Sequence, residues 1–348
     1  MLRFFKSLIL MTIIVGGVWA LVNRERLQDQ EKLIEEFGVW RNEISATASA
    51  AWLRIGEQVA QMSPPVESSV TDVERLGWGL GNPDNRAQND QPILRLGCFG
   101  LDHFGADPSD LDQLWLLAET CRRFDLISLQ GIDGRDDRWL DMLADLLGKM
   151  DERADYYYIT DREIEAGLPT QNCVLFNRRT IELDQLKWYI VDDPAGLFQR
   201  RPLVGWFRSR VSQADRAFTF TIANVELPED SAPQNRFRLR TLMRAIQNDG
   251  RLEDDIILMG KTGEIQLADG LPSRSSGGFQ AVISGPTDLL GRQAVDNIVL
   301  NTMATAEYTG QGGAFDFYRH YNLTLPQAQA LSSRLPVWAE FSLFEAGE

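Results

Sequence analysis

Hydrophobic and polar positions divide the chain into four stretches. Residues 7–22 carry no charged side chain, and residues 24–62 repeat apolar residues mostly three or four positions apart. Between residues 63 and 91, Pro, Gly, Ser, Asn and Asp gather, which is typical of a linker. From residue 92 to residue 348, short apolar runs alternate with amphipathic stretches, which predicts one folded α/β domain.

Within residues 92–348 the apolar runs are mostly four to eight residues long, the length of buried strands. They predict strands at 93–96, 125–129, 156–159, 173–176, 188–191, 204–207, 218–225, 255–259, 279–283, 297–300 and 336–342. Amphipathic stretches predict helices at 111–123, 138–150 and 231–247. Many strands and few helices favour two packed β-sheets flanked by helices.

The uncharged run at 7–22 is the membrane candidate. It is short for a bilayer span, which needs about 20 residues. A cleaved signal peptide would have the same pattern, but Val18, Trp19 and Ala20 make a poor cleavage site. We therefore predict a retained single-pass anchor at residues 1–23, with signal-peptide cleavage as the alternative. We expect the domain on the extracytoplasmic side, although the nearly balanced flanking charges say little about orientation.

The apolar repeat at 24–62 predicts an amphipathic helix that serves as a stalk between membrane and domain. Trp40, Ile44, Ala48, Ala51 and Trp52 are part of the repeat. Two alternatives remain open. The helix drives homo-oligomerisation, or it folds back onto the domain.

Composition limits the classes of partner and of metal site that the chain can have. The formal net charge of -15 disfavours nucleic acid, because phosphate binding depends on Lys and Arg. The expected partner is a protein or a small anionic ligand. The 3 cysteines lack CxxC spacing and favour buried thiols, with one disulfide as an alternative outside the cytoplasm. With 2 histidines, His103 and His320, a histidine-rich metal site is excluded, and both residues are expected to be structural.

Seven phrases occur in a familiar order. They are GCFG (97–100), LQG (129–131), FQRRP (198–202), NVE (224–226), GKTG (260–263), VDNI (295–298) and SSRLPV (332–337). In this order they resemble the endonuclease/exonuclease/phosphatase superfamily, whose fold is DNase I-like. The resemblance covers residues 93–343. It implies a four-layer α/β sandwich of two mixed sheets with helices outside, and phosphoester hydrolysis with a divalent metal, usually Mg²⁺.

The residues at the family's catalytic positions are different in this chain. Gly100 stands for an Asn, Gly131 for the metal-holding Glu, Glu226 for a His, Lys261 for an Asp, Gly263 for an Asn, and Ser333 and Arg334 for an Asp-His pair. Arg200, Asn224 and Asp296 match the family pattern. The changes remove oxygen ligands for a metal. They also add cations, one of which, Arg, does not release its proton at neutral pH.

The sequence therefore predicts that metal-dependent catalysis is lost, with no cofactor, and that the domain binds or scaffolds. Arg200, Asn224, Lys261, Asp296 and Arg334 form the predicted anion or ligand site; the alternative is that the cations close the site as internal salt bridges with Glu226 and Asp296. Two other functions stay open. One is a divergent Mg²⁺-dependent phosphodiesterase, phosphatase or nuclease that uses Asp296, Glu226 and Asn224. The other is a structural oligomerising protein.

Overall fold

A computed structural model of the chain describes residues 93–106, 111–162, 167–229, 232–251, 253–265 and 279–346. All of them belong to one unit, Val73–Glu348. The predicted anchor (1–23), amphipathic helix (24–62) and linker (63–91) lie outside the described residues. Among the helices that are described, none is long and apolar enough to cross a membrane.

The first sheet has six strands in the order β11-β12-β1-β2-β4-β3. Its strands are β1 (Ile93–Phe104), β2 (Leu126–Asp133), β3 (Tyr156–Thr160), β4 (Thr170–Asn177), β11 (Tyr308–Ala314) and β12 (Val337–Ser342). Strands β1 and β2 are parallel and are connected through helix α3 (Leu111–Cys121), whereas the other neighbours are antiparallel. The sheet is therefore mixed.

The second sheet repeats this plan in the order β5-β6-β7-β8-β10-β9. Its strands are β5 (Ile181–Ile190), β6 (Arg200–Ser209), β7 (Thr219–Glu226), β8 (Ile256–Lys261), β9 (Phe279–Ala281) and β10 (Asp296–Asn301). Helix α5 (Ala232–Gln247) connects the parallel pair β7 and β8. A short 3₁₀ turn, Ala214–Arg216, precedes β7.

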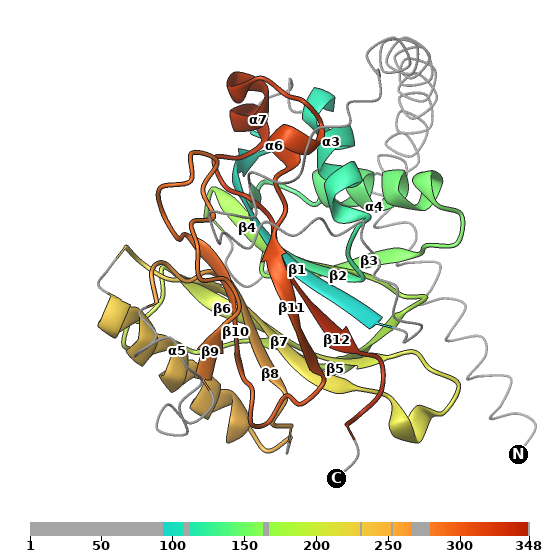
Figure 1. Cartoon of the computed structure of the whole chain (residues 1–348), viewed down its shortest axis with the longest axis vertical. Coiled ribbons are helices and arrows are strands. Elements are labelled where there is room, and N and C mark those ends of the chain that lie inside the picture. Colours follow the sequence, from blue (N-terminus) through green and yellow to red (C-terminus); the bar gives the residue numbers. More distant parts are fainter. Residues whose placement is uncertain are drawn as a thin grey trace, which may run out of the picture. The chain divides into compact units, whose positions relative to one another are not determined.

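Alternating side chains explain how the layers pack. In β8, Ile257 and Met259 lie in the central core between the sheets, while Ile256 and Leu258 pack with Leu239 of α5 on the outer side. Helices α3, α4 (Arg138–Met150), α6 (Phe317–His320) and α7 (Leu325–Leu331) lie on the side of the first sheet (Figure 1). The predicted pair of mixed sheets with outer helices is confirmed.

The topology brings the sequence phrases to one edge of the domain. The carboxyl ends of the parallel pairs β1–β2 and β7–β8 carry four of them. Strands β10 and β12 run antiparallel to β8 and β1, so their first residues reach the same edge: Asp296 is opposite Lys261, and Val337 is opposite Cys98. Residues far apart in the chain thus meet there.

Candidate functional site

The strand-end site consists of the residues that the sequence phrases single out: Gly100, Gly131, Arg200, Asn224, Glu226, Lys261, Gly263, Asp296, Ser333 and Arg334. Gly100 and Gly131 lie in β1 and β2, Glu226 and Lys261 end β7 and β8, and Asp296 begins β10. Glu226 is directly opposite Lys261 in the sheet. Gly263 follows β8, and Ser333 and Arg334 precede β12.

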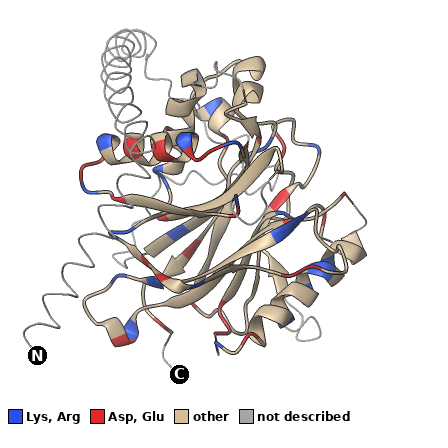
Figure 2. Cartoon of the chain, turned by 180° about the vertical axis from the view of Figure 1, so that it is seen from behind, with Lys and Arg blue, Asp and Glu red and all other residues tan. Residues whose placement is uncertain are grey.

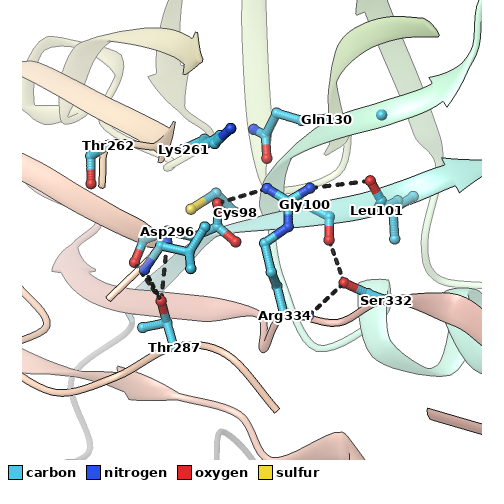
Figure 3. Close-up of polar contacts among 12 residues, drawn as sticks. Cys98, Gly100, Leu101, Gln130, Lys261, Thr262, Thr287, Asp296, Ser332 and Arg334 are labelled. Carbon is cyan, nitrogen blue, oxygen red and sulfur yellow. Dashed lines mark hydrogen bonds and ion pairs between the residues drawn. The ribbon is translucent and has the colours of Figure 1, made fainter. Parts of the chain in front are cut away.

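Arg334 is the centre of this site (Figure 3). Its Nη1 lies 3.2 Å from Oδ1 of Asp296, and its Nη2 donates to the carbonyl of Leu101 at 3.1 Å. Asp102 adds a more distant carboxylate, 3.9 Å from Nη2. Burial acts to lower the pKa of Arg334, but nearby carboxylates, led by that of Asp296, raise it overall. The guanidinium is therefore fixed and charged.

The missing side chain of Gly100 provides the space for this guanidinium. A Cβ atom on Gly100 would lie 2.1 Å from both Cζ and Nη1 of Arg334, far inside van der Waals contact. The Arg334 side chain thus occupies the volume into which a side chain at position 100 would extend.

The residues before Arg334 hold its backbone. The Ser332 hydroxyl donates to the carbonyl of Gly100 at 2.6 Å and accepts from the Arg334 amide at 2.9 Å. The Ser333 amide donates to Oδ2 of Asp102 at 2.6 Å. These contacts join the start of β12 to the end of β1, so the position of the guanidinium is determined from both strands.

Asp296 is fully buried beside Arg334. Its backbone is held by Thr287, whose hydroxyl accepts from the Asp296 amide at 3.0 Å. Oδ2 has no hydrogen-bond partner among the described residues. Burial raises the pKa of Asp296, and Arg334 opposes that rise. The carboxylate therefore depends on Arg334 for its stabilisation.

Two further glycines leave no room for the oxygen ligands of the family. Gly131 has φ +77°, and a Cβ on it would lie 2.2 Å from the carbonyl oxygen of Leu101. Gly263 has φ +62°, and its Cβ would lie 2.7 Å from Nδ2 of Asn235. Left-handed backbone already disfavours most side chains, and a carboxylate at position 131 would require the backbone to move.

Lys261 and Glu226 do not form the ion pair that the salt-bridge alternative included. Nζ of Lys261 donates to Oε1 of Gln199 at 3.1 Å and lies 4.0 Å from the carboxylate of Glu229. Burial raises the pKa of Glu226, while a hydrogen bond from Asn172 and the charge of Arg200 lower it. The salt-bridge alternative also included an ion pair between Arg334 and Asp296, and the structure contains that pair.

Arg200 and Asn224 are bonded inside the domain. Arg200 is buried, forms an ion pair with Asp161 and donates to the carbonyl of Thr170 at 2.6 Å. The amide of Asn224 donates to the carbonyls of Leu129 and Cys173 at 3.1 and 3.0 Å, and accepts from Gln130 at 2.7 Å. Both side chains therefore stabilise the packing of the sheets. Whether this edge binds an anion stays a prediction.

The histidines and cysteines lie in structural surroundings. His103, with φ +64°, contacts the carbonyl of Pro169 at 3.1 Å, and His320 contacts Arg123 at 3.0 Å and the ring of Phe315. The three cysteines are free thiols in the core, as the sequence indicated.

A magnesium ion does not fit the residues present at this edge. Mg²⁺ requires several oxygen ligands in near-octahedral arrangement. Here the only buried carboxylate oxygen without a partner among the described strand-end residues is Oδ2 of Asp296, and its sister oxygen already contacts a guanidinium. Gly100 and Gly131 supply no side-chain oxygen. A divalent cation would also have to bind close to the fixed charge of Arg334.

Sequence reasoning missed several partners that complete the site. Asp102, Gln130 and Asp161 each bond a predicted residue, yet none of the three was placed in the predicted site. Gln130 belongs to the phrase LQG. Of the three residues, it is the one whose position could have been predicted from the alternation of side chains along a strand. The contact between Asp161 and Arg200 spans 39 residues and has no sequence signal.

No protein-family model and no curated protein matches this chain. It is similar to solved structures. A functionally unknown conserved protein from Enterococcus faecalis is 11% identical, with a TM-score of 0.48 over 73% of this chain and 100% of that one. An endonuclease/exonuclease/phosphatase family protein from Bacteroides thetaiotaomicron is 12% identical, with a TM-score of 0.46 over 72% and 98%. TDP2 from Caenorhabditis elegans is 13% identical, with a TM-score of 0.47 over 73% and 77%.

One of the three structures bears the name of the family that the phrases indicate.

Proposed function

We propose that this chain carries a DNase I-like domain that lacks metal-dependent phosphoesterase chemistry and acts as a binding or scaffolding module at a membrane. One observation carries the catalytic part of the proposal. The guanidinium of Arg334 fills the space beside Gly100 and pairs with Asp296, the acid that matches the family pattern. A fixed cation therefore stands where the family's chemistry needs oxygen ligands and proton carriers.

The remaining groups supply little acid–base chemistry. An Arg side chain does not donate or accept a proton at neutral pH. Glu226 is a carboxylate and would repel the anionic oxygens of a phosphoester. Efficient phosphoester hydrolysis requires stabilisation of the charge that develops in the transition state, and the guanidinium of Arg334 is already engaged with Asp296 and with the carbonyl of Leu101.

The binding part of the proposal is supported by the outer surface of α5. Arg236, Arg240 and Arg244 recur at intervals of four, on one side of the helix. Phe237 is exposed, and the guanidinium of Arg240 lies 5.4 Å from the ring centroid of Phe279. Figure 2 shows Lys and Arg on this helix. These Arg side chains and the exposed aromatic residue fit a local acidic patch on a protein partner, whereas the net charge of -15 opposes the continuous phosphate charge of a nucleic acid.

The catalytic proposal is tested with the full-length protein and two generic substrates, a bis-aryl phosphodiester and an aryl phosphomonoester. With Mg²⁺ or Mn²⁺ we expect hydrolysis no faster than in buffer with the metal alone. Turnover that disappears both with EDTA and in a folded Glu226→Ala variant would overturn the proposal.

The membrane part rests on residues 1–23 and is tested separately. The full chain should remain with membranes after a carbonate wash, and a chain without residues 1–23 should not. Mass measurement of the mature protein distinguishes the two sequence alternatives, because signal-peptide cleavage would leave a shorter chain and contradict the retained anchor.

A further inference from the structure

Three carboxylates meet at the edge of the domain opposite the strand-end site. Asp255 directly precedes β8, Glu307 directly precedes β11, and Glu345 follows β12. One oxygen from each lies within 4.8 Å of the others. Residues at sequence distances of 38 to 90 positions are thus brought together into one group, here called the acidic triad.

Two members of the acidic triad are buried and incompletely bonded. Asp255 is 6% exposed and Glu307 is 4% exposed. Oδ1 of Asp255 and Oε2 of Glu307 have no hydrogen-bond partner among the described residues. No Lys or Arg in the described part of the chain forms a salt bridge with the triad. Buried charges in proteins are normally paired or coordinate a metal, so this group lacks a cation.

The other oxygens of the triad are held by the protein. Oε1 of Glu307 accepts from the Ala346 amide at 2.6 Å. Oε1 of Glu345 accepts from the amide and hydroxyl of Thr219 at 2.8 and 3.0 Å. Such outer contacts orient carboxylates that bind metals and leave the second oxygen available.

The electrostatics of the triad also favour a bound cation. Burial, followed by the charge of Glu307, raises the pKa of Asp255 to about 8. Burial also raises the pKa of Glu345, and Glu307 adds to the rise. The carboxylates therefore repel one another in a poorly solvated place, and a bound cation or a shared proton would relieve that repulsion.

We propose that the acidic triad binds a calcium ion. All the available ligand atoms are oxygens, which suits a hard cation. Two oxygens bound to one Ca²⁺ lie at most about 5 Å apart, twice the Ca–O distance, whereas the limit for Mg²⁺ is about 4.2 Å. Three oxygens that all lie within 4.8 Å of one another are inside the limit for Ca²⁺, and Ca²⁺ also accepts irregular coordination, whereas Mg²⁺ demands a near-ideal octahedron. Glu345 is only partly buried and gives the ion a route from solvent.

A calcium ion here would have a structural role. It would fasten the C-terminal segment, through Glu345, to the beginning of β8 and to the connection between β10 and β11. This role is independent of the strand-end site and of the proposed loss of catalysis.

The test compares the full-length protein, in detergent and stripped with EDTA, with and without CaCl₂. We expect the melting temperature to rise by about 5–10 °C when free Ca²⁺ is a hundredfold above its dissociation constant. Asp255→Asn and Glu307→Gln should lose this response. Asp215→Asn, the same change at an exposed residue nearby, should keep it.

Misfolding of the variants is distinguished by their behaviour without calcium. Each replaces a buried carboxyl group by a neutral isostere and removes its part in the mutual repulsion of the triad, so in EDTA both should melt no lower than the wild type. An equal calcium response in Asp255→Asn and the wild type would overturn the proposal. So would an equal response to Mg²⁺, or a melting temperature that rises on acidification and ignores calcium, since a shared proton would then be the stabilising element.

Discussion

At the scale of single residues, the strand-end site is governed by a volume and a charge that depend on each other. The Arg334 guanidinium can lie beside β1 because position 100 carries no side chain. Asp296 can be buried there because this guanidinium is 3.2 Å away. Removal of the cation alone would leave a buried carboxylate without its partner, which typically costs about 3–5 kcal/mol.

This dependence predicts the result of a double-mutant cycle. Gly100→Ala should destabilise the protein by about 1–3 kcal/mol, because the new Cβ displaces the guanidinium. In an Arg334→Ala background the same change should cost less, with a coupling free energy of about 0.5–3 kcal/mol. Urea unfolding of the wild type, the two single variants and the double variant measures this coupling free energy. Simple additivity would show that residues 100 and 334 do not compete for one volume.

A second residue-scale prediction concerns pH. Because the pKa of Glu226 is raised above its ordinary value of 4.5, its contribution to stability is fully present below that pH and is lost as pH rises through the folded-state value. Glu226→Gln should therefore gain stability relative to the wild type between pH 4 and pH 8. Melting temperatures across this range measure the difference. A difference that stays constant or shrinks toward pH 8 would contradict the raised pKa.

The sequence identified which residues reach the site but not what they bond. Arg200 and Asn224 match the family pattern, and their types suit ligand binding equally well as internal hydrogen bonds. In the structure Arg200 forms an ion pair with Asp161, and Asn224 donates hydrogen bonds to two backbone carbonyls. These partners lie 39 to 95 residues away in the chain, and only the packed sheets bring them together.

At the scale of elements, hydrophobic patterning located most strands and failed where the pattern is absent. Strand β11 reads YTGQGGA, with three glycines and little alternation, and it was not predicted. The first part of β5, from Ile181, was missed because its partly exposed residues lack a clear apolar face. Both are edge strands of their sheets, where one side has no partner strand and the sequence constraint is weaker.

An element-scale prediction follows from β2, whose pairing with β4 shifts register between Leu129 and Ile132, around Gly131. Gly131→Ala should destabilise the protein by more than about 2 kcal/mol, because the residue has φ +77° and its Cβ would meet the Leu101 carbonyl. Gly148→Ala is the matched control. Gly148 lies in helix α4 with no atom within 4 Å of a new Cβ, so the change should stabilise by about 0.5–1 kcal/mol. Thermal unfolding measures both, and equal effects would contradict the strain expected at residue 131.

At the scale of the whole molecule, the two sheets are joined by polar as well as apolar contacts. Asn224 lies on the inner side of β7 and bonds residues of β2 and β4 across the interface. Its side chain therefore fixes the position of one sheet on the other near the strand-end site. Hydrophobic packing alone is less directional, which gives this residue a specific role in the geometry of the edge.

The last prediction tests that role. Asn224→Ala should destabilise the protein by about 2–4 kcal/mol, because Gln130 loses its acceptor, two carbonyls lose a donor and a small cavity forms. Hydrogen exchange should then quicken in both sheets together, since the contact joins them. Asn248→Ala, at an exposed asparagine that bonds only its own helix, should change stability by less than about 1 kcal/mol. Faster exchange confined to β7 would mean that Asn224 stabilises its own strand and that the apolar core alone joins the sheets.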